Sequence, residues 1–293
     1  MINTVQCCDC ISGFKQIPDG SIDLIVTSPP YNCGKNYEVY LDERPWKEYY
    51  SFIGDFLDCA YTSLKVGGTI AIVVPPTIKF QHDHKYADTW SDFDKTYKTH
   101  RGPVKVLGRG RIEPIAHRIR TMMELRDPHM RESIIWVKAA EGQPPISTNY
   151  CMGCDSDPFI RSVYETILIG SKGKWFHTGG TGRRGKDAVP YMDYTKDVWN
   201  IPATSSRIHP APFPEDIPDR LIKLFTHTPE SVVLDPFAGI GTTLVAAVKN
   251  NRKFIGFEIN NKYCEIARKK ISALVEQKTI GDNFERKTKT VLL

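Results

Sequence analysis

The chain has 293 residues, of which 41% are hydrophobic and 25% are charged, enough for one large or two modest domains with a buried core. Its net charge of +5 is mildly basic, which is compatible with a polyanionic partner but does not require one. No basic N-terminal segment leads into an apolar run, and no apolar run could span a bilayer, so we expect a cytoplasmic protein with no membrane partner.

In the first part of the chain, short apolar runs alternate with helical patterns. Strands are predicted over residues 4–8, 22–26 and 69–74, and helices over 11–18 and 46–64. The second strand is followed by Ser28-Pro29-Pro30-Tyr31, and the two prolines end it because neither has an N–H to donate. Residues 32–44 are polar and aromatic and are predicted to form a mobile loop.

The middle of the chain carries two basic segments among regular elements. A helix is predicted over residues 113–125, and strands over 133–137 and 165–170. Residues 79–111 show no period and become basic in their second half, as expected either of a flexible basic loop or of a solvated face. Residues 172–186 mix glycines, aromatics and basic residues, which suits contact with a phosphate backbone and equally suits a surface loop.

Eight scattered cysteines without a secretion signal indicate reduced thiols and no disulfide framework. Cys151 and Cys154 have zinc-knuckle spacing, but no second Cys or His pair lies near them in the sequence. We therefore predict no metal site.

The C-terminal part gives the clearest pattern. It predicts a helix over 215–226, a strand over 231–234, a helix over 244–250, a strand over 253–257 and a helix over 261–274. A tight glycine loop, residues 235–243, joins the first of these strands to the next helix. The remainder, after residue 277, is polar and is expected to be loosely held.

Alternating strands and helices predict an α/β domain with a mostly parallel sheet, whose ligands lie beyond the carboxyl ends of the strands. Gly239, Gly241 and Glu258 have the layout of a dinucleotide site, in which glycines admit a ligand and the acid accepts from ribose hydroxyls. Asp235 would repel a pyrophosphate and attract an ammonium, which favours S-adenosylmethionine. A phosphate ligand remains the alternative, although the P-loop Lys-Ser/Thr ending is missing.

Ser28 and Asp235 both follow strands, so they are expected to meet at one edge of the sheet. The loop at Ser28 offers a hydroxyl, peptide carbonyls of fixed φ and an aromatic ring, a set that suits a planar ligand with an exocyclic amine. A proline turn that only closes a strand is the alternative for this loop.

Together, these motifs resemble those of site-specific DNA amino-methyltransferases, which methylate N4 of cytosine or N6 of adenine. The catalytic loop of that family is matched by residues 28–31, and its Asp-Pro-Phe-x-Gly-x-Gly-Thr-Thr loop by residues 235–243. The catalytic loop comes first, which is the order of the family's beta class. The resemblance extends to residues 209–214, to Phe257-Glu258 and to Asp9 beside the adenine amine.

The resemblance implies an α/β fold with a doubly wound, permuted sheet of the S-adenosylmethionine-dependent methyltransferase type, with inserted DNA-recognition loops. Its implied domains are a catalytic domain over 1–78, 113–171 and 198–277, a basic insertion over 79–112, a target-recognition region over 172–197 and a tail over 278–293. The expected catalytic residues are Ser28, Pro29, Pro30 and Tyr31. The expected cofactor contacts are Asp9, Phe213, Asp235, Pro236, Phe237, Ala238, Gly239, Gly241, Thr242 and Glu258. The expected DNA contacts are Lys105, Arg109, Arg111, Arg183, Arg184 and Lys186.

In the implied mechanism, Ser28 and the Pro29 carbonyl accept from the two amine N–H groups, and Tyr31 stacks on a base flipped out of double-stranded DNA. Serine in place of aspartate at position 28 favours N4 of cytosine. N6 of adenine remains the first alternative, and a DNA-binding module without activity is the second. The resemblance also admits a homodimer and a cognate restriction endonuclease as partners.

Overall fold

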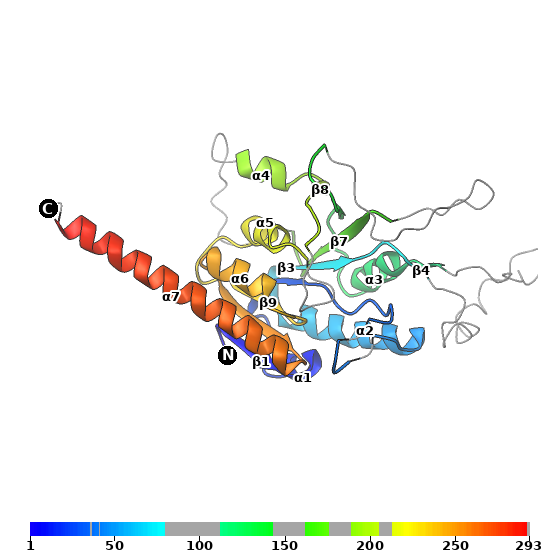
Figure 1. The fold of residues 1–293 in the computed structure, drawn as a ribbon. Helices are drawn as coiled ribbons and strands as arrows, with labels where there is room; N and C mark the ends of the chain where they lie inside the picture. Colours follow the sequence, from blue (N-terminus) through cyan, green and yellow to red (C-terminus); the bar gives the residue numbers. More distant parts are fainter. Residues whose placement is uncertain are drawn as a thin grey trace, which may run out of the picture.

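The structure is a computed structural model that describes residues 1–35, 37–40, 42–79, 112–142, 162–175, 189–204 and 213–291. Its centre is an eight-stranded sheet in the order β1-β10-β9-β2-β3-β7-β6-β8 (Figure 1). The strands are β1 (Thr4–Cys7), β2 (Ile22–Thr27), β3 (Leu64–Val74), β6 (Ile134–Val137), β7 (Tyr164–Ser171), β8 (Val198–Asn200), β9 (Val232–Asp235) and β10 (Lys253–Glu258).

Five neighbouring strands, from β1 through β3, run parallel, while β7 is antiparallel to both β3 and β6. This confirms the predicted α/β fold with a mostly parallel sheet. Strand β3 is parallel to β2 on one side only, because its other neighbour is the antiparallel β7. The edge strand β8, parallel to β6, was not predicted as a strand.

Helices cover both faces of the sheet. They are α1 (Cys10–Phe14), α2 (Trp46–Ser63), α3 (Ile115–Glu124), α4 (Val189–Tyr194), α5 (Asp216–Phe225), α6 (Thr242–Lys249) and α7 (Asn261–Val291). The α7 helix continues well past the predicted end at residue 274, so the segment expected to be a loose tail is helical (Figure 1).

The side-chain alternation of β3 divides the core into two layers. Ile70 and Ile72 pack on the face covered by α1, α2 and α3, whereas Ala71 and Val73 pack on the face covered by α5, α6 and α7. These side chains are almost completely buried because helices cover both faces of the sheet at this strand. Each layer fixes the strands between them, and hence the loops at their ends.

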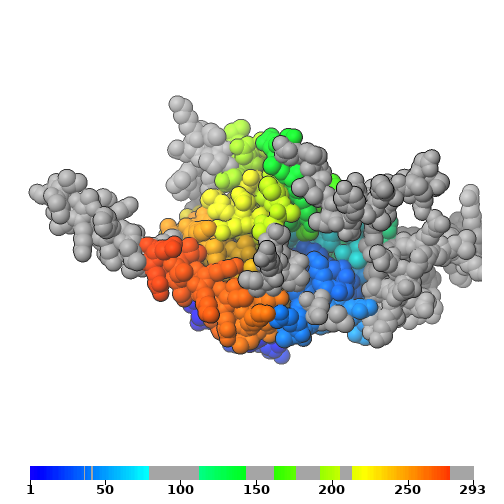
Figure 2. All heavy atoms as spheres, viewed as in Figure 1, coloured from blue at the N-terminus to red at the C-terminus, as the bar shows by residue number. Residues whose placement is uncertain are grey.

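The first and last parts of the sequence are neighbours in space. In β1, Val5 pairs with Gly256 of β10, and Figure 2 shows orange C-terminal residues directly against blue N-terminal ones. The short antiparallel pair β4 (Ile78–Lys79) and β5 (Ile112–Glu113) places Lys79 opposite Ile112. In the described part of the chain, no helix has both the length and the apolar character needed to cross a membrane.

Candidate active site

A buried hydrogen bond connects the residue just before the proline loop, residues 28–31, to the start of the glycine loop, residues 235–243. Because β2 pairs with β9, their carboxyl ends lie side by side, and the Thr27 hydroxyl donates to Oδ1 of Asp235 across 2.7 Å. Thr243 donates to Oδ2 across 2.6 Å, and the Phe237 N–H donates to Oδ1 across 3.1 Å. The predicted meeting of these two strand ends is therefore confirmed.

The position of Asp235 corrects one expectation from the sequence. Its side chain is 1% exposed, and it is absent from the residues that line the adjacent pocket. Burial raises the pKa of this carboxyl to about 6, although the hydrogen bonds from Thr243 and Thr27 oppose the rise. Asp235 thus supports the glycine loop from beneath, with its carboxyl bonded to Thr27, Thr243 and the Phe237 N–H.

The glycine loop is shaped by backbone requirements. Gly241 has a φ of +84° and precedes α6, and a Cβ there would lie 2.8 Å from the Cβ of Ala267 in α7. Only glycine permits this close approach with that left-handed backbone. Gly239 directs its N–H to Oε2 of Glu258 across 2.8 Å. The loop therefore binds the acid at the end of β10.

Glu258 is held at both oxygens. The Asn260 N–H donates to Oε1 across 2.8 Å while Gly239 occupies Oε2. Burial raises the pKa of the Glu258 carboxyl, and the backbone hydrogen bonds from Asn260 and Gly239 oppose the rise. Each oxygen keeps a further lone pair, so the carboxylate is an oriented acceptor at the pocket wall.

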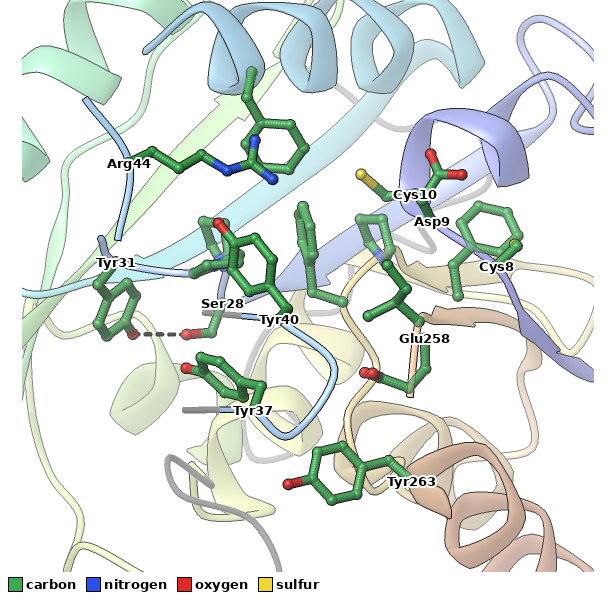
Figure 3. Close-up of a pocket in the computed structure, with 17 residues that line it drawn as sticks. Cys8, Asp9, Cys10, Ser28, Tyr31, Tyr37, Tyr40, Arg44, Glu258 and Tyr263 are labelled. Carbon is green, nitrogen blue, oxygen red and sulfur yellow. Dashed lines mark hydrogen bonds between the residues drawn. The ribbon is translucent and has the colours of Figure 1, made fainter. Parts of the chain in front are cut away.

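The proline loop places a hydroxyl at the other end of the same pocket. Oγ of Ser28 lies 2.6 Å from the Tyr31 hydroxyl. The dashed line in Figure 3 marks this hydrogen bond. Two acceptors also lie within hydrogen-bond distance of the Tyr31 hydroxyl: the Val73 carbonyl at 3.2 Å and Oε2 of Glu165 at 3.0 Å. Tyr49 donates to the Pro30 carbonyl across 2.9 Å, which fixes the second proline.

One pocket in the described part of the chain joins these groups. Of the predicted site residues, the following line it: Asp9, Ser28, Pro29, Pro30, Tyr31, Pro236, Phe237 and Glu258. The remaining described candidates do not line it: Phe213, Asp235, Ala238, Gly239, Gly241 and Thr242. Ala238 and Gly239 support the wall through hydrogen bonds to Phe257 and Glu258 instead.

Asp9 has a structural task as well as a place at the pocket edge. Its Oδ1 accepts from the Ser12 N–H across 3.0 Å and so caps α1. Hydrogen bonds from Ser12 lower the pKa of the Asp9 carboxyl. Its neighbours Cys8 and Cys10 also line the pocket.

Sequence reasoning missed four polar lining residues. Tyr37, Tyr40 and Arg44 come from the loop that follows Tyr31, and Tyr263 comes from the first turn of α7 (Figure 3). The signal that could have found them is two tyrosines and an arginine within a short segment directly after the catalytic loop. That segment was expected only to be mobile.

Hydrogen bonds tie this loop down at its base. The buried carboxylate of Asp42 accepts from the N–H groups of Asn32 and Cys33 across 2.7 and 3.1 Å. Asn32 adopts a φ of +58°, and its side chain bonds the backbone of Arg44 in both directions. These bonds set the path of the segment that carries Tyr37 and Tyr40.

A second set of contacts joins the tip of the loop to the start of α7. The Asn260 side chain donates to the Tyr37 carbonyl across 3.1 Å, and Lys262 pairs with Glu38 across 2.9 Å. Asn260 is therefore shared between Glu258 and the loop. Tyr37, Tyr40 and Glu258 all line the pocket, and Asn260 links the loop of the two tyrosines to Glu258.

Several predicted residues lie outside the described residues: Lys105, Arg109, Arg111, Cys151, Cys154, Arg183, Arg184, Lys186 and residues 209–212. Among all the residues that the structure describes, no three His, Cys, Asp or Glu side chains are grouped closely enough to hold a metal ion.

Comparison with known proteins gives a consistent result. A family model described as DNA methylase matches residues 22–269. The Type II methyltransferase M.BglII of Bacillus subtilis is 28% identical over 288 residues, covering 91% of this chain and 68% of that protein. The DNA adenine methyltransferase YhdJ of Escherichia coli (strain K12) is 28% identical over 287 residues, covering 90% of this chain and 80% of that protein.

A solved structure shows the same fold. It is TTHA0409 of Thermus thermophilus, complexed with S-adenosyl-L-methionine, which superimposes with a TM-score of 0.65 at 21% identity. The match covers 93% of this chain and 94% of that one.

Proposed function

The chain belongs to the DNA methylase family of N6 and N4 amino-methyltransferases, and we propose that it methylates N4 of cytosine in duplex DNA with S-adenosylmethionine as donor. One observation carries this proposal. One pocket in the described part of the chain is lined both by Ser28 and by Glu258, which Figure 3 labels, and Pro236 and Phe237 line it as well. Such a pocket can hold an adenosine-bearing donor and a planar base together.

The donor half of the pocket fits an adenosine. Glu258 offers oriented carboxylate oxygens for ribose hydroxyls, since backbone N–H groups already fix both of its oxygens. Phe237 and Ile259 supply apolar surface for a purine ring, and Asp9 supplies an acceptor for its amine. When bound, S-adenosylmethionine supplies a methyl carbon that bonds to the attacking nitrogen while its sulfur keeps the electron pair of the broken bond.

The acceptor half works by positioning. Ser28 Oγ and the Pro29 carbonyl accept one N–H each from the exocyclic amine, which draws the nitrogen lone pair out of the ring and toward the methyl carbon. The Pro30 carbonyl is already bonded by Tyr49, so Pro29 provides the second acceptor. After the attack, the nitrogen releases one proton to solvent. No covalent bond to the protein is required.

Tyr31 supports a flipped base in this scheme. Its ring lines the pocket but is only 9% exposed, and its hydroxyl is bonded to neighbouring residues. A ring held in this way offers a pre-ordered stacking surface, and stacking offsets the few kcal/mol that base flipping costs.

The choice of cytosine rests on Ser28. A neutral hydroxyl is a weaker acceptor than the carboxylate found at this position in many relatives, and serine is the commoner residue in N4-cytosine enzymes. The alternative is N6 of adenine in the same pocket, and the name of the 28% identical relative YhdJ favours it. A module that binds DNA without methylating it is the third candidate.

Duplex DNA is the proposed partner, contacted by the basic residues of segments 79–112 and 172–197, whose site residues lie outside the described part. A homodimer and a cognate restriction endonuclease are further partners that the family resemblance suggests.

The direct test is transfer of a labelled methyl group from S-adenosylmethionine to duplex DNA. We expect transfer by the wild type and none by Ser28→Ala, with cofactor affinity unchanged by calorimetry. The matched control is Ser51→Ala, at an exposed serine on α2, which should transfer at the wild-type rate. Cofactor binding without transfer to any duplex would instead support the non-catalytic module.

A further inference from the structure

We propose that Glu165 is a positioning residue that commits the Ser28 hydroxyl to act as an acceptor for the target amine. The inference rests on the proposed function, because it assigns a task within that same site. Glu165 lies on β7, far from both motifs in the sequence, and neither motif pointed to it.

The Tyr31 hydroxyl determines which atom donates in each hydrogen bond between Ser28, Tyr31 and Glu165. It has one hydrogen and three partners within hydrogen-bond distance: Ser28 Oγ at 2.6 Å, Glu165 Oε2 at 3.0 Å and the Val73 carbonyl at 3.2 Å. An ionised carboxylate and a peptide carbonyl can only accept. The phenol hydrogen is therefore used on Glu165 or Val73.

It follows that the contact between Ser28 and Tyr31 must be bridged by the Ser28 hydrogen. The opposite direction would leave the phenol oxygen facing two acceptor oxygens with no hydrogen between them. With its hydrogen directed to Tyr31, Ser28 presents only lone pairs elsewhere. Because Ser28 lines the pocket, those lone pairs are available to an amine N–H.

A cation pairs with the far oxygen of Glu165. Lys138, which follows β6, contacts Oε1 of Glu165 across 2.6 Å, and the Glu165 side chain is only 12% exposed. The Lys138 ammonium also lies 5.3 Å from the centre of the Trp136 ring. Full burial raises the pKa of Tyr31 well above its usual value, so the phenol keeps its one hydrogen.

The network gives a catalytic advantage because a free serine hydroxyl rotates. A rotation that aimed its hydrogen at the amine would remove one of the two acceptors on which the attack depends. If the Ser28 hydroxyl is already fixed in the accepting orientation, it does not have to rotate during the reaction. Glu165 acts through Tyr31 and Ser28, so it should affect turnover and not binding.

The test substitutes Glu165 by glutamine, which has the same shape. The retained Lys138 will draw the amide oxygen and turn the amide NH₂ toward Tyr31. The Val73 carbonyl at 3.2 Å then competes with the nearer Ser28 Oγ, at 2.6 Å, for the phenol hydrogen, so Ser28 is no longer fixed as an acceptor. We expect kcat to fall by roughly tenfold, with KM for DNA and for the donor within about twofold and Tm unchanged. Glu132→Gln, at an exposed glutamate two residues before β6, is the matched control and should leave kcat unchanged.

Three further variants separate positioning from folding. Tyr31→Phe should lower kcat. Adding Glu165→Gln to it should cause no additional fall, because the hydroxyl that connects Glu165 to Ser28 is already missing. Glu165→Gln combined with Lys138→Met leaves no unpaired charge and allows the amide oxygen to face Tyr31. This double variant should therefore recover part of the lost kcat.

The outcomes distinguish the two proposals. If wild type transfers no methyl group to any duplex, the proposed function fails and the role of Glu165 with it. If wild type is active and Ser28→Ala is not, but Glu165→Gln keeps the full kcat, only the role of Glu165 is overturned. Additive losses in Tyr31→Phe with Glu165→Gln would also overturn it.

Discussion

The Thr27 hydroxyl and Oδ1 of Asp235 lie 2.7 Å apart, although the two residues are separated by 208 positions in the sequence. This bond is buried, and it joins the strand that delivers the proline loop to the strand that delivers the glycine loop. The proline loop and the glycine loop, which form the two halves of the candidate site, are therefore held at a fixed position relative to each other. A ligand that binds one half is held in register with the other.

Asp235 should make stability depend on pH. Its pKa of about 6 in the folded protein exceeds the ordinary value of 3.8, so the folded state binds more protons between about pH 4 and pH 6. The free energy of unfolding should therefore fall as pH rises through that window, by about 3 kcal/mol. Above the window this contribution is constant.

Urea unfolding of wild type and Asp235→Asn at several pH values measures this effect. The difference between the two isolates Asp235 from other titrating groups, including Glu258. A difference that does not change between pH 4 and pH 6 would show that the carboxyl titrates normally.

Glu258 should control donor affinity. Replacing it by alanine removes the acceptor proposed for the ribose and leaves the Gly239 and Asn260 N–H groups without their partner. We expect donor affinity to fall by at least about tenfold, since such hydrogen bonds to charged groups contribute roughly 1.5–3 kcal/mol. Calorimetry with S-adenosylmethionine measures it, and Glu265→Ala, on exposed α7 surface, is the control. Undiminished affinity would place the donor elsewhere.

Asp42 should matter for the loop that carries Tyr37 and Tyr40. Its carboxylate holds the N–H groups of Asn32 and Cys33, and burial raises its pKa. Asp42→Ala leaves both donors unpaired, which costs about 1–3 kcal/mol for each buried group. We expect a lower Tm and weaker donor binding, while the exposed control Asp55→Ala changes neither. Normal donor binding in Asp42→Ala would mean that the loop is dispensable.

The basic segments should set the salt dependence of DNA binding. Neutralising Arg183 and Arg184 should weaken binding to every duplex and reduce the slope of log affinity against log salt, by about 0.9 for each phosphate that the protein no longer neutralises. Fluorescence anisotropy at several salt concentrations measures the slope. An unchanged slope would show that Arg183 and Arg184 do not contact DNA phosphates.

Much of the fold follows from the sequence because its signals are local. The apolar spacing in α2 and the β-branched run in β3 each determine an element on their own. The glycine loop and the proline loop could be placed at one sheet edge, since parallel strands deliver their ends together.

The rest depends on relations between distant residues. Glu165 lies on a strand that pairs antiparallel with β3, with Val73 opposite Ile167, and nothing local in its sequence marks it as a neighbour of Tyr31. The role of Asp235 could not be read from its position after a strand, because burial depends on Thr27 and Thr243 packing over it. Likewise, the loop after Tyr31 looked mobile because its anchors, Asn260 and Lys262, come from the other end of the chain.

The measurement that tests the central claim most directly is nucleoside mass spectrometry of duplex DNA treated with the wild-type protein and S-adenosylmethionine. The proposal predicts N4-methylcytosine, and no modified base with Ser28→Ala. N6-methyladenine alone would contradict the assignment to cytosine, and N4-methylcytosine formed at the wild-type rate by Ser28→Ala would contradict the site itself.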